Sequence, residues 1–233
     1  MLSTTFNMYT DATGPDPDSS SATLTSYHKL LWSKPLPSGD VFELRDDEPG
    51  YYLYHNSHVG EFSLGSDAIT HSYRNHHRKK WLTEQIPNDL QELFDVGSAI
   101  GAYLVFPNRQ INRLPTINQL RGSHAPIDDR FDLTLECIRR FYAYTQSPLT
   151  DVLERYASFF RLFESFEGYV EFFLLDDLVD KHGGVNFYLP FEGFASAPGF
   201  KDVCDYRSYI AGVERFVRGR NARTERYAAR LGG

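Results

Sequence analysis

The chain has 233 residues, of which 41% are hydrophobic and 24% charged, and this composition excludes a disordered or fibrous chain. Its formal net charge of −7 argues against a protein that coats duplex nucleic acid, because such a protein needs many cations to replace condensed counterions. The unusual feature is an aromatic content of 15%, with 18 Phe, 15 Tyr and 2 Trp.

The charge is unevenly distributed. Residues 1–70 carry 3 basic and 10 acidic side chains, and residues 81–200 carry 9 basic and 17 acidic ones. Residues 71–80 carry 4 basic and no acidic side chains, and residues 201–233 carry 8 basic and 4 acidic ones. Two basic patches on an acidic body are therefore predicted. The two cysteines form no CxxC pair, and no apolar run approaches the length of a membrane span, so we expect a cytoplasmic protein without membrane contact.

The N-terminal part predicts an irregular lead-in over residues 1–23, because Asp, Ser, Pro and Gly are frequent there. Ser21 or Thr23 is expected to cap a helix that ends near Trp32, before two prolines. Short aromatic and β-branched runs then predict a β-meander over residues 41–44, 51–55 and 61–64, with residues 68–73 as an extension of the third run.

The remaining chain predicts a helix over residues 81–94, interrupted at Pro87, and a strand over residues 99–106. Helices are then expected over residues 129–145, 148–163, 166–180 and 205–230, with one strand over residues 185–189. The predicted fold is a single α+β domain over residues 1–233, in which an N-terminal antiparallel β-meander packs against a mainly helical C-terminal half.

The most suggestive polar segment is residues 116–140. Asn118 and Arg121 are expected in a loop, and Asp132, Glu136 and Arg139 fall at i, i+4 and i+7 on one helix face. An arginine beside paired carboxylates suits a phosphate, a sugar or a metal-bound water. The alternative is a strip of salt bridges, with Arg121 tied to Asp128 or Asp129.

Candidate roles follow from this pattern. The catalytic candidates are Asp132 and Glu136, as a base or as holders of a divalent ion. The ligand-binding candidates are Asn118, Arg121, Asp129, Arg130, Arg139, His55 and Trp32.

Histidines cluster early in the chain, at positions 55, 58, 71, 76 and 77, but none has HExxH spacing, so no metal site is predicted and no cofactor is assigned. His55 in YYLYHNS is similar to the nicotinamide-pocket histidine of ADP-ribosyltransferases. The Tyr and Glu strands that such a fold requires cannot be placed in this chain.

Two basic groups are candidates for contacts with nucleic acid or a protein partner. An aromatic ring beside cations can stack a base while the cations follow the phosphates. The first group precedes Trp81, and the second lies on one face of the last helix, where it could equally pack on the acidic body. Their members are Arg74, Arg78, Lys79 and Lys80, and Arg215, Arg218, Arg223 and Arg226.

Three motifs, LLWSKPLP, TINQLRG and IDDRFDLTLECIRR, resemble an uncharacterised bacterial or phage family known only as a domain of unknown function. The resemblance covers nearly the whole chain and implies a single full-length domain, but no activity.

Two functions are therefore expected from different classes. The first is binding or processing of a phosphate-bearing ligand, a nucleotide or RNA, at the Asn118/Arg121/Asp129/Asp132/Glu136 region. The second is a non-catalytic interaction or regulatory protein of the defence type that uses its cationic C-terminal helix. The sequence predicts neither the ligand nor the oligomeric state.

Overall fold

The computed structural model describes residues 3–14, 17–42, 44, 53–58, 60–70, 79–195 and 199–231. Its strands are β1 (Tyr54–Ser57), β2 (Gly60–Ala68) and β3 (Tyr103–Pro107). Its helical elements in chain order are η1 (Met8–Thr10), α1 (Pro17–Ser20), α2 (Ala22–Trp32), α4 (Lys80–Thr83), α5 (Pro87–Gly97), η2 (Ile100–Ala102), α6 (Ile117–Ser123), α7 (Phe131–Tyr142), α8 (Thr150–Arg155), α9 (Ala157–Arg161), α10 (Phe166–Phe173), η3 (Asp176–Leu178) and α11 (Val203–Leu231).

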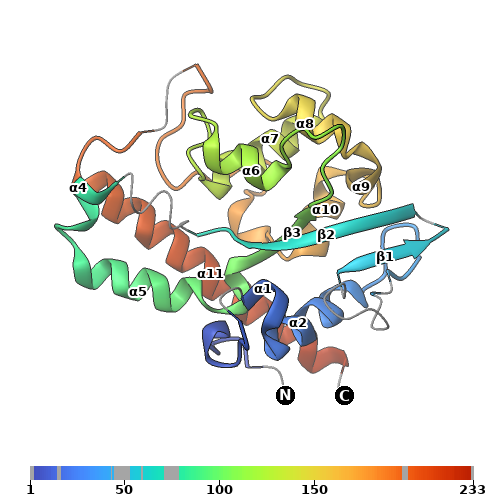
Figure 1. Cartoon of the computed structure of the whole chain (residues 1–233). Coiled ribbons are helices and arrows are strands. Elements are labelled where there is room, and N and C mark those ends of the chain that lie inside the picture. Colours follow the sequence, from blue (N-terminus) through green and yellow to red (C-terminus); the bar gives the residue numbers. More distant parts are fainter. Residues whose placement is uncertain are drawn as a thin grey trace.

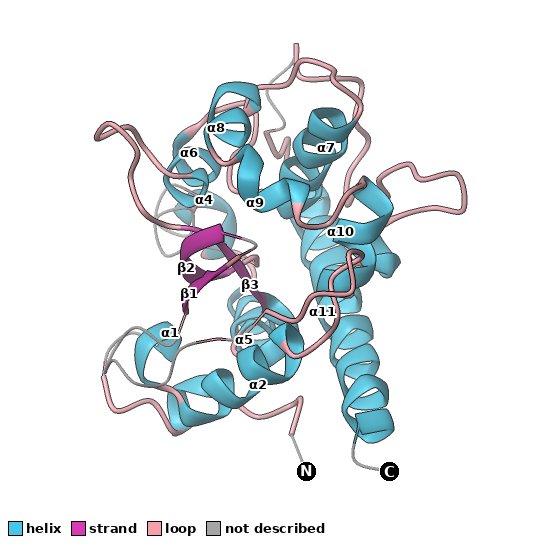
Figure 2. Ribbon diagram, turned by 90° about the vertical axis from the view of Figure 1, so that its right-hand side faces the viewer, coloured by secondary structure: helices cyan, strands magenta, loops and turns pink. Residues whose placement is uncertain are grey.

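These elements form an α+β fold with a mainly helical C-terminal half, which confirms the predicted fold class. The small sheet lies in the middle of the molecule, with α6–α9 on one side and α1 and α2 on the other (Figures 1 and 2). The long helix α11 packs against α5 and η2. The two ends of the described chain lie at the same end of the molecule, where Thr4 donates a hydrogen bond to Glu225.

The sheet is antiparallel, in the order β1-β2-β3. Its register pairs Tyr54 with Ser63 across β1 and β2, and Leu64 with Pro107 across β2 and β3. Side chains alternate along β2, because successive residues of a strand point to opposite faces. Phe62 and Leu64 are buried, and Ser63 between them is more exposed. The predicted meander thus supplies two strands, and the third comes from residues 103–107.

Two predicted strands are wrong. Within residues 41–44, the three that the structure describes (41, 42 and 44) form only an isolated bridge between Pro35 and Val41, which follows a tight turn at Gly39, where φ is +89°. Residues 185–189 hold only a bridge from Val185 to Val179. The backbone N–H of Tyr188 donates to the side chain of Asp132 at 2.9 Å instead of to a neighbouring strand. Residues 45–52 and 71–78, which include parts of the predicted meander, lie outside the described residues.

Several helices begin or end elsewhere than predicted. The TINQ segment forms a capping box at the start of α6, so Asn118 and Arg121 lie on a helix and the predicted loop is wrong. The helix predicted over residues 148–163 is divided between α8 and α9 at Tyr156, and the one predicted over residues 166–180 ends when Leu174 takes a left-handed conformation with φ of 57°. Within the expected lead-in, residues 8–10 and 17–20 form single helical turns.

The aromatic excess is concentrated in the core, as predicted. One hydrophobic cluster extends from Met8 to Val217. Trp32 is fully buried at its centre, with ring-centroid distances of 4.5 Å to Phe42, 5.1 Å to Phe172 and 5.8 Å to Phe173. Burial of rings of this size contributes a few kcal/mol each, which makes the cluster a principal source of stability.

The C-terminal helix also contains a buried cation. Arg220 has no exposed surface and donates to the carbonyl oxygens of Phe173, Gly101 and Tyr103 and to the hydroxyl of Tyr27. These four acceptors come from α10, from the η2–β3 segment and from α2. The side chain therefore anchors α11 to three other parts of the fold, since an unpaired buried guanidinium would be strongly destabilising.

Candidate functional site

The predicted polar region forms two buried ion-pair groups. In the first, Arg121 of α6 is 1% exposed. Its Nη1 lies 3.0 Å from Asp67 Oδ2 and 3.2 Å from Asp129 Oδ1. Its Nη2 donates to the backbone oxygen of Asp129 at 3.2 Å. The guanidinium thus holds β2, α6 and the turn before α7 together, which is the structural alternative foreseen for this residue.

Asp67 was missed by the sequence reasoning. It lies near the end of β2 as a single acidic residue in SLGSDA, and no local spacing connects it to Arg121, 54 positions away. Burial, together with the nearby Asp129 carboxylate, raises the pKa of Asp67 to about 6, although the charge of Arg121 acts to lower it. Asp67 is therefore a carboxyl group that titrates close to neutral pH.

In the second group, Arg130 lies at the N-cap position of α7 and pairs with Asp132. The two contacts are 3.1 Å from Nε to Oδ1 and 2.5 Å from Nη2 to Oδ2, and both residues are at most 2% exposed. Asp132 Oδ2 also accepts the backbone N–H of Tyr188. The carboxylate therefore connects α7 to the segment before α11. Asp128, in the turn before α7, accepts from Lys79 Nζ at 2.6 Å.

Glu136, one turn along α7, is 4% exposed and accepts from two arginines. Arg139 contacts it at 2.7 and 2.9 Å, and Arg140 at 2.8 Å. Burial acts to raise the pKa of Glu136, but the hydrogen bonds and charges of both arginines outweigh it and the pKa is lowered. Side chains of Arg139 and Arg140 are 35% and 27% exposed, so this group reaches the surface. Catalysis by Asp132 or Glu136 stays a prediction.

Three other predicted ligand-binding residues, Trp32, His55 and Asn118, make no hydrogen bond to these ion pairs. Trp32 and His55 both contact Phe42, where the His55 ring stacks at 3.6 Å in the aromatic core. The Oδ1 atom of Asn118 is buried and has no hydrogen-bond partner among the residues that the structure describes. A ligand role for these three residues stays a prediction.

The first basic group falls mostly outside the described residues, since Arg74 and Arg78 belong to residues 71–78. Lys79 is 8% exposed and pairs with Asp128, and Lys80 pairs with Glu84 at 3.3 Å on the surface. Within the described part of the chain, these two lysines are therefore already compensated.

The second basic group is partly compensated by the acidic body. Arg218 contacts Glu92 at 2.9 Å, and Arg223 contacts Asp177 at 2.9 Å and Asp176 at 3.4 Å. Two exposed members of the group, Arg215 and Arg226, form no ion pair with any described residue.

Arg215 lines a pocket of about 360 Å³ beside α11, which we call the Arg215 pocket. Its walls combine three aromatic rings with small polar groups, and its base follows the side of α11 where Ser208, Gly212 and Gly219 leave room. The lining residues are Asp177, Leu178, Asn186, Phe187, Tyr188, Ser208, Gly212, Arg215, Phe216 and Gly219.

The wall of the Arg215 pocket depends on two features described above. A Cβ atom at Gly212 would lie 2.8 Å from Cδ1 of Tyr188, so only glycine permits the tyrosine ring to pack this closely on α11. The backbone of the same tyrosine is held by Asp132. The buried pair of Arg130 and Asp132 therefore positions this wall, although neither residue is in the pocket lining.

Across the described ranges, no group of three or more His, Cys, Asp or Glu side chains is arranged to hold a metal ion. His71, His76 and His77 lie outside those ranges. No helix within the described part of the chain is both long and apolar enough to cross a membrane.

These features define an α+β protein with a buried aromatic core, internal arginine–carboxylate pairs and a small pocket beside its last helix. The chain belongs to DUF6994, a family of unknown function, whose family model matches residues 2–224. The resemblance to an uncharacterised family is thereby confirmed. Comparison with curated proteins and with solved structures gives no match for this chain.

Proposed function

We propose that the protein binds a small phosphate-bearing ligand, a nucleoside monophosphate in size, in the Arg215 pocket. The observation that supports this is the exposed guanidinium of Arg215, which has no ion pair with any described residue and borders a pocket with aromatic walls. An arginine without a carboxylate partner presents its N–H donors in the geometry that suits a phosphate.

Other arginines of the predicted region are less suited to contact the phosphate. Arg121 is 1% exposed and already contacts two carboxylates, and Arg130 is 2% exposed and paired through two contacts. A phosphate that reached either one would have to displace a carboxylate and enter the core, at a large desolvation cost. In this proposal Arg130 and Asp132 position the pocket wall, and Arg121 and Asp129 stabilise the connection between α6 and α7.

The remaining lining fits the organic part of such a ligand. Phe187 and Phe216 offer apolar ring surfaces for a base, and Asn186 and Ser208 offer polar groups for its edge or for a ribose hydroxyl. A volume of about 360 Å³ is at the lower end of ordinary ligand pockets, which favours a mononucleotide over an RNA strand. The proposal includes a cytoplasmic location, where nucleotides are present as free ligands.

The test is calorimetric titration of the full chain with a nucleoside monophosphate and with the same nucleoside lacking phosphate. We expect saturable binding of the monophosphate and a loss of about tenfold to a hundredfold in Arg215→Gln, as for removal of a charge-assisted hydrogen bond. The matched control is Arg226→Gln, which removes an exposed cation from the same helix outside the pocket. Equal loss in both variants, or equal binding of the nucleoside without phosphate, would refute the proposal.

A second candidate function is contact with an acidic partner protein through the end of α11. Arg226 and Arg230 are exposed there, and neither forms an ion pair with a described residue. Deletion of residues 215–233 is unsuitable as a test, because this segment includes the buried Phe216, Val217 and Arg220. The charge-reversed variant Arg226→Glu/Arg230→Glu should lose a partner recovered by the unaltered chain while keeping its melting temperature. Undiminished recovery of that partner would exclude this function.

A further inference from the structure

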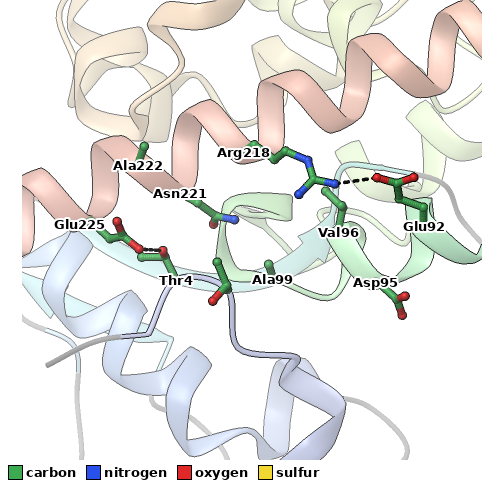
Figure 3. A pocket seen from close by; sticks show the side chains of 10 residues that line it. Thr4, Glu92, Asp95, Val96, Ala99, Arg218, Asn221, Ala222 and Glu225 are labelled. Carbon is green, nitrogen blue, oxygen red and sulfur yellow. Dashed lines mark hydrogen bonds and ion pairs between the residues drawn. The ribbon is translucent and has the colours of Figure 1, made fainter.

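Two arginines at the end of α7 share one carboxylate. Oε1 of the buried Glu136 accepts from Arg139 Nη2 at 2.9 Å and from Arg140 Nε at 2.8 Å, so the two guanidiniums lie side by side. In the described ranges, Glu136 is the one carboxylate within ion-pair distance of either arginine. By contrast, Glu92 contacts Arg218 alone in the pocket between α5 and α11 (Figure 3). The group at the end of α7 therefore retains one net positive charge.

Each of these two arginines has a donor that the fold leaves unused. Arg139 Nη1 and Arg140 Nη2 make no hydrogen bond to any described residue. Neither nitrogen is a buried atom without a partner, so solvent reaches both of them. Arg140 is held in place, because its Nη1 donates to the backbone oxygen of Gln146 and its guanidinium lies 4.9 Å from the centroid of the Phe194 ring. A second anion would meet donors that are already oriented, and it would reduce the repulsion between the two cations.

Tyr144 follows these arginines and lies almost wholly in solvent, since it is 98% exposed. The turn that contains it is bonded to α7, because Thr145 N–H donates to the backbone oxygen of Arg140 at 2.8 Å and Tyr144 N–H to that of Phe141 at 3.1 Å. Tyr144 has a φ of 54°, and helices that end with these two bonds usually carry glycine at this position. A tyrosine here gains no burial within the chain and is less suited to the backbone than glycine. Its ring is therefore better explained by contact with another molecule.

These groups together favour an acidic protein segment as the ligand. Tyrosine and arginine are among the residues that most often carry the binding energy of protein interfaces. One net positive charge matches a single carboxylate, whereas a phosphate monoester carries more than one negative charge at neutral pH. The half-buried rings of Phe191 and Phe194, with centroids 4.9 Å apart, add an apolar surface beside Arg140. The surface thus suits a carboxylate next to an aromatic side chain.

We propose that Arg139, Arg140 and Tyr144 form a docking surface for an acidic, aromatic segment of a protein partner. A glutamate or aspartate carboxylate of the partner accepts from Arg139 Nη1 and Arg140 Nη2, and an adjacent aromatic side chain contacts the Tyr144 ring. Figures 1 and 2 show α7 at the end of the molecule away from both ends of the described chain, so this surface is distinct from the end of α11. None of the three residues lines the Arg215 pocket, so the two sites can be tested separately.

The experiment is calorimetric titration of the full chain with the peptide acetyl-Glu-Phe-Glu-amide and with its uncharged analogue acetyl-Gln-Phe-Gln-amide. The test variants are Arg140→Gln, which removes the cation over Phe194, and Tyr144→Gly, which removes the exposed ring. The control for the first is Arg226→Gln, which removes an exposed cation from α11. The control for the second is Asn112→Gly, which places glycine at another exposed residue with a left-handed backbone, where φ is 55°.

We expect saturable binding of the glutamate peptide and none of the glutamine peptide. Arg140→Gln should weaken binding by about tenfold or more, as for loss of a charge-assisted hydrogen bond. Tyr144→Gly should also weaken binding while it raises the melting temperature, because glycine suits the left-handed end of the helix. A purely structural role of Tyr144 would not produce this combination. Both control variants should bind the peptide as the unaltered chain does.

A nucleoside monophosphate in excess should leave the peptide bound. Displacement of the peptide by the nucleotide would identify the surface as a phosphate site and overturn the proposal. Absence of saturable binding, equal binding of the glutamine peptide, or equal weakening in the control variants would overturn it as well. Nucleotide binding at the Arg215 pocket is measured with another ligand and another variant, so failure of one proposal is distinguishable from failure of the other.

Discussion

Replacing Asp132 by alanine tests whether its carboxylate is part of the architecture. The substitution leaves Arg130, which is 2% exposed, without its anionic partner, and such a loss costs about 3–5 kcal/mol of unfolding free energy. The backbone N–H of Tyr188 also loses its acceptor, which adds about 1 kcal/mol. Domains of this kind are stable by only about 5–15 kcal/mol, so Asp132→Ala should be close to unfolding.

The companion variant is Arg130→Met/Asp132→Leu, which replaces both charges by apolar groups of similar size. Because the buried charge is removed together with its partner, we expect most of the lost stability to return, apart from the contribution of the Tyr188 amide. The assay is urea unfolding monitored by tryptophan fluorescence. The dependence of the unfolding free energy on urea concentration is compared between the variants. A loss below about 1 kcal/mol in Asp132→Ala, or a double variant as unstable as the single one, would refute a structural role.

Three further outcomes are expected. Gly212→Ala should destabilise the fold by about 1–3 kcal/mol in urea unfolding and weaken nucleotide binding, because the added Cβ would crowd the Tyr188 ring. The control Gly199→Ala, which has open space around it, should change neither stability nor binding. Burial and repulsion by Arg220 lower the pKa of Lys34 from 10.5 to about 7. The unfolded chain therefore binds one more proton between these values, and stability should rise with pH there by up to about 1.4 kcal/mol per unit. In Lys34→Met, stability measured by thermal melting should rise less steeply with pH over this range. An unchanged dependence on pH would refute the assignment of this pKa to Lys34. Burial also raises the pKa of Cys137 to about 12, so a thiol reagent should modify only the exposed Cys204 until the protein is unfolded.

Local sequence signals predicted much of the helical structure. Ser21 caps α2 through the backbone N–H of Leu24, as expected. The predicted interruption at Pro87 falls between two helices, since α4 ends at Thr83 and α5 begins at Pro87. The capping box of Thr116 and Gln119 was a local signal of the same kind, but it was missed because the polar residues of TINQLRG suggested a loop. The strand predicted over residues 185–189 and the described part of the one predicted over residues 41–44 are absent, because a strand requires a partner and apolar composition does not supply one.

The polar residues show why the site itself was harder to predict. Spacing placed Asp132 and Glu136 on one face of α7, which is correct for a helix, but it did not reveal that both are buried. The pairing of Arg121 with Asp67 and the contact of Asp132 with Tyr188 join residues 54 and 56 positions apart. No periodic pattern encodes such contacts. The arginines that remain exposed, including Arg215, became distinguishable only when the partners of the others were known.

The most direct test of the central claim is a crystal structure of the full chain grown with a nucleoside monophosphate. We predict that the phosphate oxygens lie within hydrogen-bond distance of the Arg215 guanidinium, and that the base lies against Phe187 or Phe216. A phosphate bound at Arg139 and Arg140, at Arg226, or at Arg121 after its ion pairs have broken would contradict the account. Such a result would assign the anion site to another part of the molecule.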